Sequence, residues 1–296
     1  MKKYKLSMRT RESLTGLFYL TPFLIGVCVF FLFPVGASFV LSFGDLDPES
    51  LGFRIIVKGW QHYIFAFTED AHFVPLLIST ARKTLIEAPL IVIFSLILAI
   101  LLSKVRKMSG FFRVVLLLPF VLGTGEVMNQ LISQGVDTRI ISLTNSEIIP
   151  REWLLYIGSD FVTVLDTLFS SIIRILWQSS VQIVLFLSAI LGISPALYES
   201  AKIDGANAYE TFWKITLPMV SPVLLLNMIY TIIASFTDGS NRMLEFISDY
   251  MLKYGNHGYA AALGWVYFVM VLLIIGVVAL VLGRYVKANQ GYGGKR

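Results

Sequence analysis

Glu199-Ser-Ala-Lys-Ile-Asp-Gly205, followed after nine residues by Ile215-Thr-Leu-Pro218, lies between two long apolar stretches of this chain. A Ser-Pro pair at 194–195 favours a helix start, because Ser can accept bonds from free N–H groups and Pro fits the first helical position. Gly205 can end that helix in the left-handed conformation. The pattern therefore predicts a helix-turn-helix loop over about 193–218. We expect a second short helix over Ala206–Ile215 before the next apolar span.

The composition indicates a membrane protein. Apolar residues make up 56% of the chain and charged residues 15%, against roughly 45–50% and 25% in soluble domains. A membrane-spanning helix needs about 20 mostly apolar residues, and continuous apolar runs exclude the alternating pattern of a barrel. The sequence therefore predicts an all-α integral membrane protein with six transmembrane helices. The expected spans are Leu14–Phe43, Phe73–Leu102, Phe111–Ser133, Leu168–Gly192, Leu217–Phe236 and Tyr259–Val286.

The distribution of Lys and Arg predicts the orientation of these spans. If the N-terminus is cytoplasmic, fifteen of the 24 basic residues fall inside and six outside, with three near span ends. Cytoplasmic loops carry the excess of basic residues, so both termini and the 193–218 loop are predicted to be cytoplasmic. The expected organisation is a cytoplasmic segment over 1–13, a transmembrane domain over 14–288 and a cytoplasmic tail over 289–296. The net charge of +5 then reflects topology, and no nucleic-acid partner is needed to explain it.

The complete spacing Glu-x-Ala-x3-Gly-x9-Ile-x-Leu-Pro resembles the EAA loop of bacterial ABC-importer permeases. Leu20-Thr-Pro22, Phe33-Pro34 and Trp60-Gln-His-Tyr63 resemble the carbohydrate-uptake, maltose-transporter-like members of that family. Ser200 departs from the usual second Ala. Asp238-Gly-Ser-Asn241 stands where Gly-Gly-Pro is common, which weakens any transfer of a substrate from the family.

The resemblance implies a type I ABC importer in the bacterial cell membrane. This multi-pass chain would pair with a second, homologous permease subunit to form a heterodimer in membrane lipid. Two ABC ATPase subunits would dock on the coupling loops and bind ATP and Mg²⁺, and an extracytoplasmic solute-binding protein would deliver the solute. Glu199 would contact a basic residue of the ATPase. The expected coupling-loop residues are Glu199, Ser200, Ala201, Ile203, Asp204, Gly205, Ile215, Leu217 and Pro218.

Polar residues at helical spacing in three spans are candidates for the solute pathway. Polar and charged groups inside a membrane normally face a bundle interior or a wet cavity, and neutral amides and hydroxyls suit a sugar better than an ion. Equally, such side chains can join helices to one another. A sugar or oligosaccharide is the expected solute, while polyol phosphates and other polar organic solutes stay open. The candidates are Arg174, Gln178, Gln182, Asn227, Thr231, Asp238, Glu126 and Asn129.

Motifs of catalysis and metal binding are absent from the sequence. It contains no G-x-x-x-x-G-K-[ST] phosphate loop and no H-E-x-x-H pair, and its three His residues and one Cys are scattered. We therefore expect a transport subunit with no catalytic residue, no metal and no cofactor of its own. An ATP-independent secondary carrier is the alternative, although carriers commonly show internal repeats that are not evident here.

Overall fold

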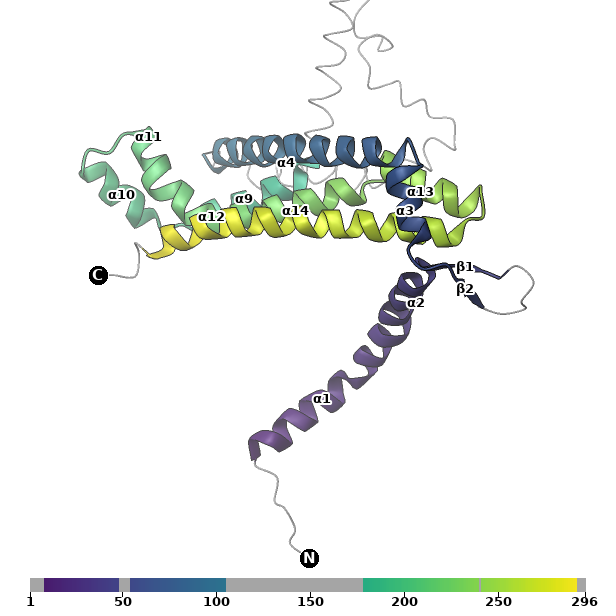
Figure 1. Ribbon diagram of the computed structural model, residues 1–296. Helices are drawn as coiled ribbons and strands as arrows, with labels where there is room; N and C mark the ends of the chain where they lie inside the picture. The colour runs from purple at the N-terminus through teal and green to yellow at the C-terminus, as the bar shows by residue number, and fades with distance from the viewer. Residues whose placement is uncertain (1–7, 48–53, 105–177, 240, 292–296) are drawn as a thin grey trace, which may run out of the picture. The chain divides into compact units, whose positions relative to one another are not determined.

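The computed structural model describes residues 8–47, 54–104, 178–239 and 241–291. This part of the chain is helical apart from one short hairpin (Figure 1). It divides into two compact units: the first comprises the described residues up to 78 with 242–270, and the second comprises those between 79 and 241 with those from 271 to 291. The division falls inside two long helices, α4 (Phe73–Ser103) and α14 (His257–Gly291).

Four stretches in the described residues are long and apolar enough to cross a membrane. They coincide with the first, second, fifth and sixth predicted spans. The predicted third span and the first ten residues of the fourth lie outside the described residues, so the total of six stays a prediction. The bent pair Ser180–Leu191 and Pro195–Ile203, which meet at 64°, would count as a fifth. The four stretches are Phe18–Leu41, Phe73–Ser103, Ala208–Leu252 and His257–Ala288.

The first unit carries the N-terminal helices and the hairpin. Its elements are α1 (Met8–Val27), the π-helical turn η1 (Cys28–Leu32), α2 (Phe33–Leu41), β1 (Gly44–Leu46), β2 (Ile55–Val57), α3 (Gln61–Thr68), α13 (Arg242–Leu252) and the first part of α14. The strands pair antiparallel, with Gly44 opposite Val57. The side chains of Phe18–Leu41 described here are largely exposed, as expected for a helix whose solvent is lipid.

Asp70 organises the start of α4 in the first unit. Its carboxylate accepts hydrogen bonds from the backbone N–H of His72 at 2.9 Å and of Phe73 at 3.2 Å. It also accepts one from the Tyr259 hydroxyl at 2.6 Å, which joins this turn to α14. Burial alone would raise the pKa of Asp70, but these hydrogen bonds to the charged form outweigh burial and lower the pKa.

The second unit holds an apolar core, against which the loop over 193–218 packs. α9 (Ser180–Leu191) packs along α12 (Leu217–Thr237), and side chains of α4 complete the cluster. Two short helices, α10 (Pro195–Ile203) and α11 (Ala208–Thr211), lie side by side at one end of this unit (Figure 1). The buried cluster comprises Val92, Leu96, Ala99, Phe186, Leu187, Ile190, Ile193, Leu217 and Val220.

Candidate functional site: the loop between α9 and α12

The first helix of the loop begins and ends where the sequence predicts. Ser194 occupies the N-cap position with Pro195 at the first helical position, although the Ser194 side chain makes no capping bond. At the other end Gly205 has φ +81°, the left-handed conformation that favours glycine. The N–H of Ala206 donates to the carbonyl of Ala201 at 2.9 Å, and the N–H of Gly205 donates to the carbonyl of Lys202 at 3.2 Å. These two bonds form a Schellman motif, which satisfies the last carbonyls of α10.

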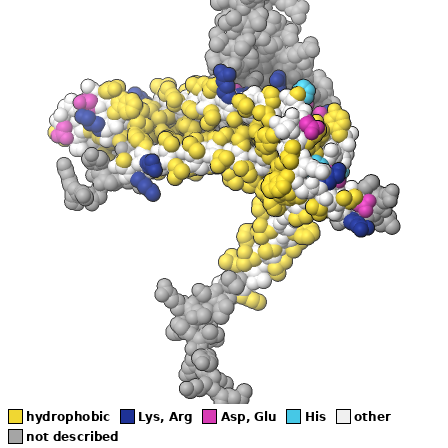
Figure 2. All heavy atoms as spheres, in the orientation of Figure 1, with side chains coloured by type: hydrophobic (Ala, Val, Ile, Leu, Met, Phe, Trp, Pro, Cys, Tyr) yellow, Lys and Arg dark blue, Asp and Glu magenta, His cyan; other side chains and the backbone are white. Residues whose placement is uncertain are grey.

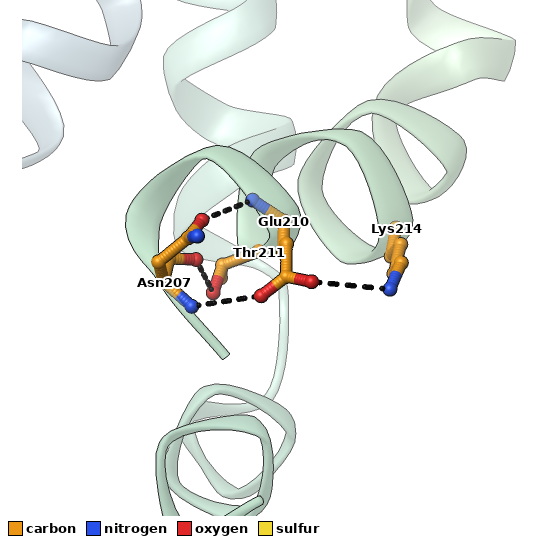
Figure 3. Close-up of polar contacts among 4 residues, drawn as sticks. All are labelled: Asn207, Glu210, Thr211 and Lys214. Carbon is orange, nitrogen blue, oxygen red and sulfur yellow. Dashed lines mark hydrogen bonds and ion pairs between the residues drawn. The ribbon is translucent and has the colours of Figure 1, made fainter. Parts of the chain in front are cut away.

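A capping box that the sequence analysis missed starts the second helix (Figure 3). The Glu210 N–H donates to the Asn207 side-chain oxygen at 2.9 Å, and the Asn207 N–H donates to a Glu210 carboxylate oxygen at 3.1 Å. The pattern Asn-x-x-Glu was the available signal. The bond from the Asn207 N–H, followed by the charge of Lys214 at 3.5 Å, lowers the pKa of Glu210.

The predicted break between the second helix and the fifth span is wrong. α11 continues through a π-helical turn, η3 (Phe212–Thr216), directly into α12, so the helix is uninterrupted from Ala208 to Thr237. The sequence predicts a separate short helix over Ala206–Ile215, followed by a span that opens at Leu217-Pro218. The loop is therefore a direct extension of α12.

One side of the loop is anchored to the core of the second unit. Tyr198 from α10 and Phe212 from η3 pack against the buried cluster. The Tyr198 and Thr216 hydroxyls are 3.1 Å apart and hydrogen-bonded, which ties α10 to the base of α12. Ala201 is only 9% exposed, and its small side chain allows α10 to lie close to the rest of the second unit.

The other side of the loop is exposed and partly apolar. Ile203 is 86% exposed and Tyr209 71%, and Leu197 and Trp213 are also exposed. Glu199, one helical turn before Ile203, is exposed on the same face of α10. Figure 2 shows apolar side chains along the long helices and charged side chains at the end that carries α10 and α11. Where lipid does not cover them, large apolar side chains beside charged groups are typical of a protein-binding surface.

The remaining coupling-loop candidates occupy both sides. Ser200, Asp204 and Gly205 are exposed with Glu199 and Ile203, whereas Leu217 is buried in the core cluster. Ile215 and Pro218 are half-buried at the base of the loop. The predicted set thus divides into a surface group near the turn and an anchoring group where the loop enters α12.

Three pathway candidates come together in the interior of the second unit. The Gln182 side-chain N–H donates to the Thr231 hydroxyl at 2.9 Å, and that hydroxyl donates to the Asn227 carbonyl at 2.7 Å. The Asn227 side-chain N–H donates to the Gln182 carbonyl at 3.2 Å. All three residues are at most 2% exposed, so they join α9 to α12. Among the described residues, Gln182 Oε1 and Asn227 Oδ1 have no hydrogen-bond partner.

The other candidates are dispersed or lie outside the described residues. Gln178 is half-buried just before α9, and Asp238 is half-buried after α12. Arg174, Glu126 and Asn129 are outside the described part of the chain. Within that part, no group of three or more His, Cys, Asp or Glu side chains is arranged to hold a metal ion.

The family that these features indicate is also found by comparison of the whole chain with known proteins. Residues 85–290 match the family described as binding-protein-dependent transport system inner membrane component. The chain belongs to this family. It is a multi-pass membrane protein and a permease subunit of a binding-protein-dependent transport system.

Individual relatives are similar over almost their full length. The probable ABC transporter permease protein YesP of Bacillus subtilis is 27% identical over 95% of this chain and 93% of its own. The arabinooligosaccharides transport system permease protein AraP of the same species is 26% identical, over 92% of this chain and 89% of AraP. Neither similarity favours the ATP-independent carrier that the sequence left open.

A solved structure shows the same fold. A chain of a bacterial alginate ABC transporter, crystallised in complex with an alginate pentasaccharide-bound periplasmic protein, superimposes with a TM-score of 0.66. The match covers 94% of this chain and 96% of that one, at 18% sequence identity. The fold of an ABC-importer permease is therefore confirmed for this chain.

Proposed function

We propose that this chain is one permease subunit of an ABC importer that carries a sugar or oligosaccharide across the bacterial cell membrane. It would have six membrane helices and cytoplasmic termini, and it would pair with a homologous permease subunit. Two ATPase subunits would hydrolyse ATP, and an extracytoplasmic binding protein would supply the solute. The permeases to which the chain is similar support the sugar class, since one is named for arabinooligosaccharides and another belongs to an alginate transporter.

The observation that carries the proposal is the two-sided geometry of the coupling loop. Its inner side is fixed to the core through Tyr198 and Phe212, while Ile203, Tyr209 and Glu199 are exposed. A surface of this kind, continuous with a membrane helix, suits a permanent cytoplasmic partner. No phosphate loop occurs in the sequence, so ATP hydrolysis would have to come from that partner.

For the solute, the buried amides of α9 and α12 support a neutral polar cargo. Gln182 Oε1 and Asn227 Oδ1, which have no partner among the described residues, could each accept hydrogen bonds. Sugar hydroxyls are suitable donors, as are side chains of neighbouring helices. We propose Gln178, Gln182, Asn227 and Thr231 as pathway residues on this basis.

The experiment is purification of the chain from its host membrane, identification of the ATPase subunits that co-purify, and reconstitution with them and the binding protein. Uptake of arabino- and malto-oligosaccharides into liposomes should require both ATP and the binding protein. Glu199→Arg should reduce co-purification of the ATPase, because it reverses the exposed charge. The matched control is Glu245→Arg, at an exposed Glu of the other unit. Uptake that proceeds without ATP would refute the proposal.

A further inference from the structure

The helix that joins the coupling loop to the membrane contains one irregular turn. From Phe212 to Thr216 the backbone is π-helical, and the N–H of Leu217 bonds the carbonyl of Phe212, five residues earlier. The residues before and after it are α-helical. A single π turn is an α-helix with one residue inserted, and such turns are frequent at functional sites.

The residue that follows this turn explains it. Pro218 has no N–H, and its ring would clash with the carbonyl of the residue four positions earlier, Lys214, in a regular α-helix. Widening the preceding turn by one residue removes that clash. The same arrangement occurs in η1, where the N–H of Phe33 bonds the carbonyl of Cys28 immediately before Pro34.

Another proline in the same helix is accommodated differently. Pro222 lies within α12 without a π turn. The carbonyl four residues earlier, that of Pro218, instead accepts a hydrogen bond from the Ser221 hydroxyl at 2.7 Å. Proline alone therefore does not produce the π turn, and Pro222 provides a matched control.

Contacts with the core hold the turn itself, since Phe212 at its start packs against the buried cluster. Thr216 is 7% exposed and bonded to Tyr198, and Leu217 is 8% exposed in the core cluster. Ala208 and Tyr209, which precede the turn in α11, are exposed. The geometry of the turn thus decides which way the exposed end faces relative to α12.

We propose that Pro218 is a positioning residue that maintains the π turn and thereby sets the rotation of the ATPase-binding end of the coupling loop about the axis of α12. One residue of an α-helix corresponds to a rotation of about 100° and a rise of about 1.5 Å. If η3 became α-helical, Tyr209 would rotate by about that angle relative to α12. This inference rests on the proposed function, because it assumes that an ATPase binds the exposed side.

The test compares three variants in nanodiscs with the ATPase subunits that co-purify with the wild-type chain. Pro218→Ala should let the turn become α-helical and weaken ATPase binding by about tenfold or more, since few molecules then present the binding orientation. Deleting Lys214 in the Pro218→Ala background removes the extra residue and should restore binding and ATP-driven uptake. Lys214 is suitable because its side chain is 74% exposed. Pro222→Ala should bind as the wild type does.

Spin labels report the rotation directly. In a Cys28→Ser background, which removes the single exposed Cys of the sequence, cysteines at Ala208 and Met219 place labels on either side of the turn. The distance between the labels should change in Pro218→Ala and return to its original value in the deletion variant.

The inference would be overturned if Pro218→Ala kept the label distance of the wild type, or if it bound the ATPase as tightly as the wild type does. It would also be overturned if the deletion variant did not recover binding. A wild-type chain that binds no ATPase at all would instead overturn the proposed function.

Discussion

Replacement of Gly205 by Val should weaken ATPase binding through the backbone alone. At φ +81° an L-residue costs roughly 1–2 kcal/mol more than glycine. No atom lies within 4 Å of a Cβ built at this position, so the chain itself provides no steric clash to add to that cost. The Schellman motif would then be populated less, and α10 and α11 would not be held in their observed orientation. A cost of 1–2 kcal/mol corresponds to a roughly 5- to 30-fold increase in the apparent Kd.

Titration of the ATPase onto the chain in nanodiscs measures this effect. Gly205→Asn is the matched control, because Asn tolerates the left-handed conformation and adds a side chain of comparable size. We expect the Asn variant to bind within a few-fold of the wild type. Binding of the Val variant within twofold of the wild type would refute the backbone argument. Equal losses in both variants would show that side-chain bulk against the ATPase, rather than φ, sets the requirement.

Three further predictions concern other contacts. Asn207→Ala should destabilise the start of α11 by about 1 kcal/mol through loss of its cap, measured as faster hydrogen exchange of the 208–211 amides; unchanged exchange would contradict it. Asp70→Asn should lower the melting temperature at pH 7, because it weakens hydrogen bonds worth about 1 kcal/mol at this partly exposed site. Since the pKa of Asp70 lies below its ordinary value of 3.8, this contribution is complete above that pH and is lost as the pH falls further, so the two melting curves should converge in acid. Gln178→Ala with Gln182→Ala should abolish uptake while ATPase binding persists, and normal uptake would exclude them from the pathway.

Local chemistry made the first half of the coupling loop predictable. The start at Ser194-Pro195 and the left-handed Gly205 depend on backbone preferences of single residues, which a sequence displays directly. The capping box at Asn207 and Glu210 is equally local and could have been found. The continuity of α11 with α12 could not be predicted in this way, because it depends on a π turn that is flanked by the packing of Phe212 and Leu217 in the core.

The interior of the second unit shows the same limit. Helical spacing placed Asn227 and Thr231 on one face of a span, since they are four residues apart. It did not indicate that Gln182, from another helix, would bond to both. That arrangement depends on the register of α9 against α12, which is set by the buried apolar side chains around them and has no signature within either helix alone.

The loop is linked directly to the helices on either side of it. α10 is bonded to the base of α12 through Tyr198 and Thr216, and α11 continues into α12 without a break. α12 is in turn bonded to α9 through Gln182, one of the proposed pathway residues. A displacement of the loop by an ATPase would therefore reach the proposed pathway through hydrogen-bonded and continuous helical structure. We therefore expect variants at Pro218, near the ATPase-binding surface, and at Gln182, in the proposed pathway, to affect the same transport step.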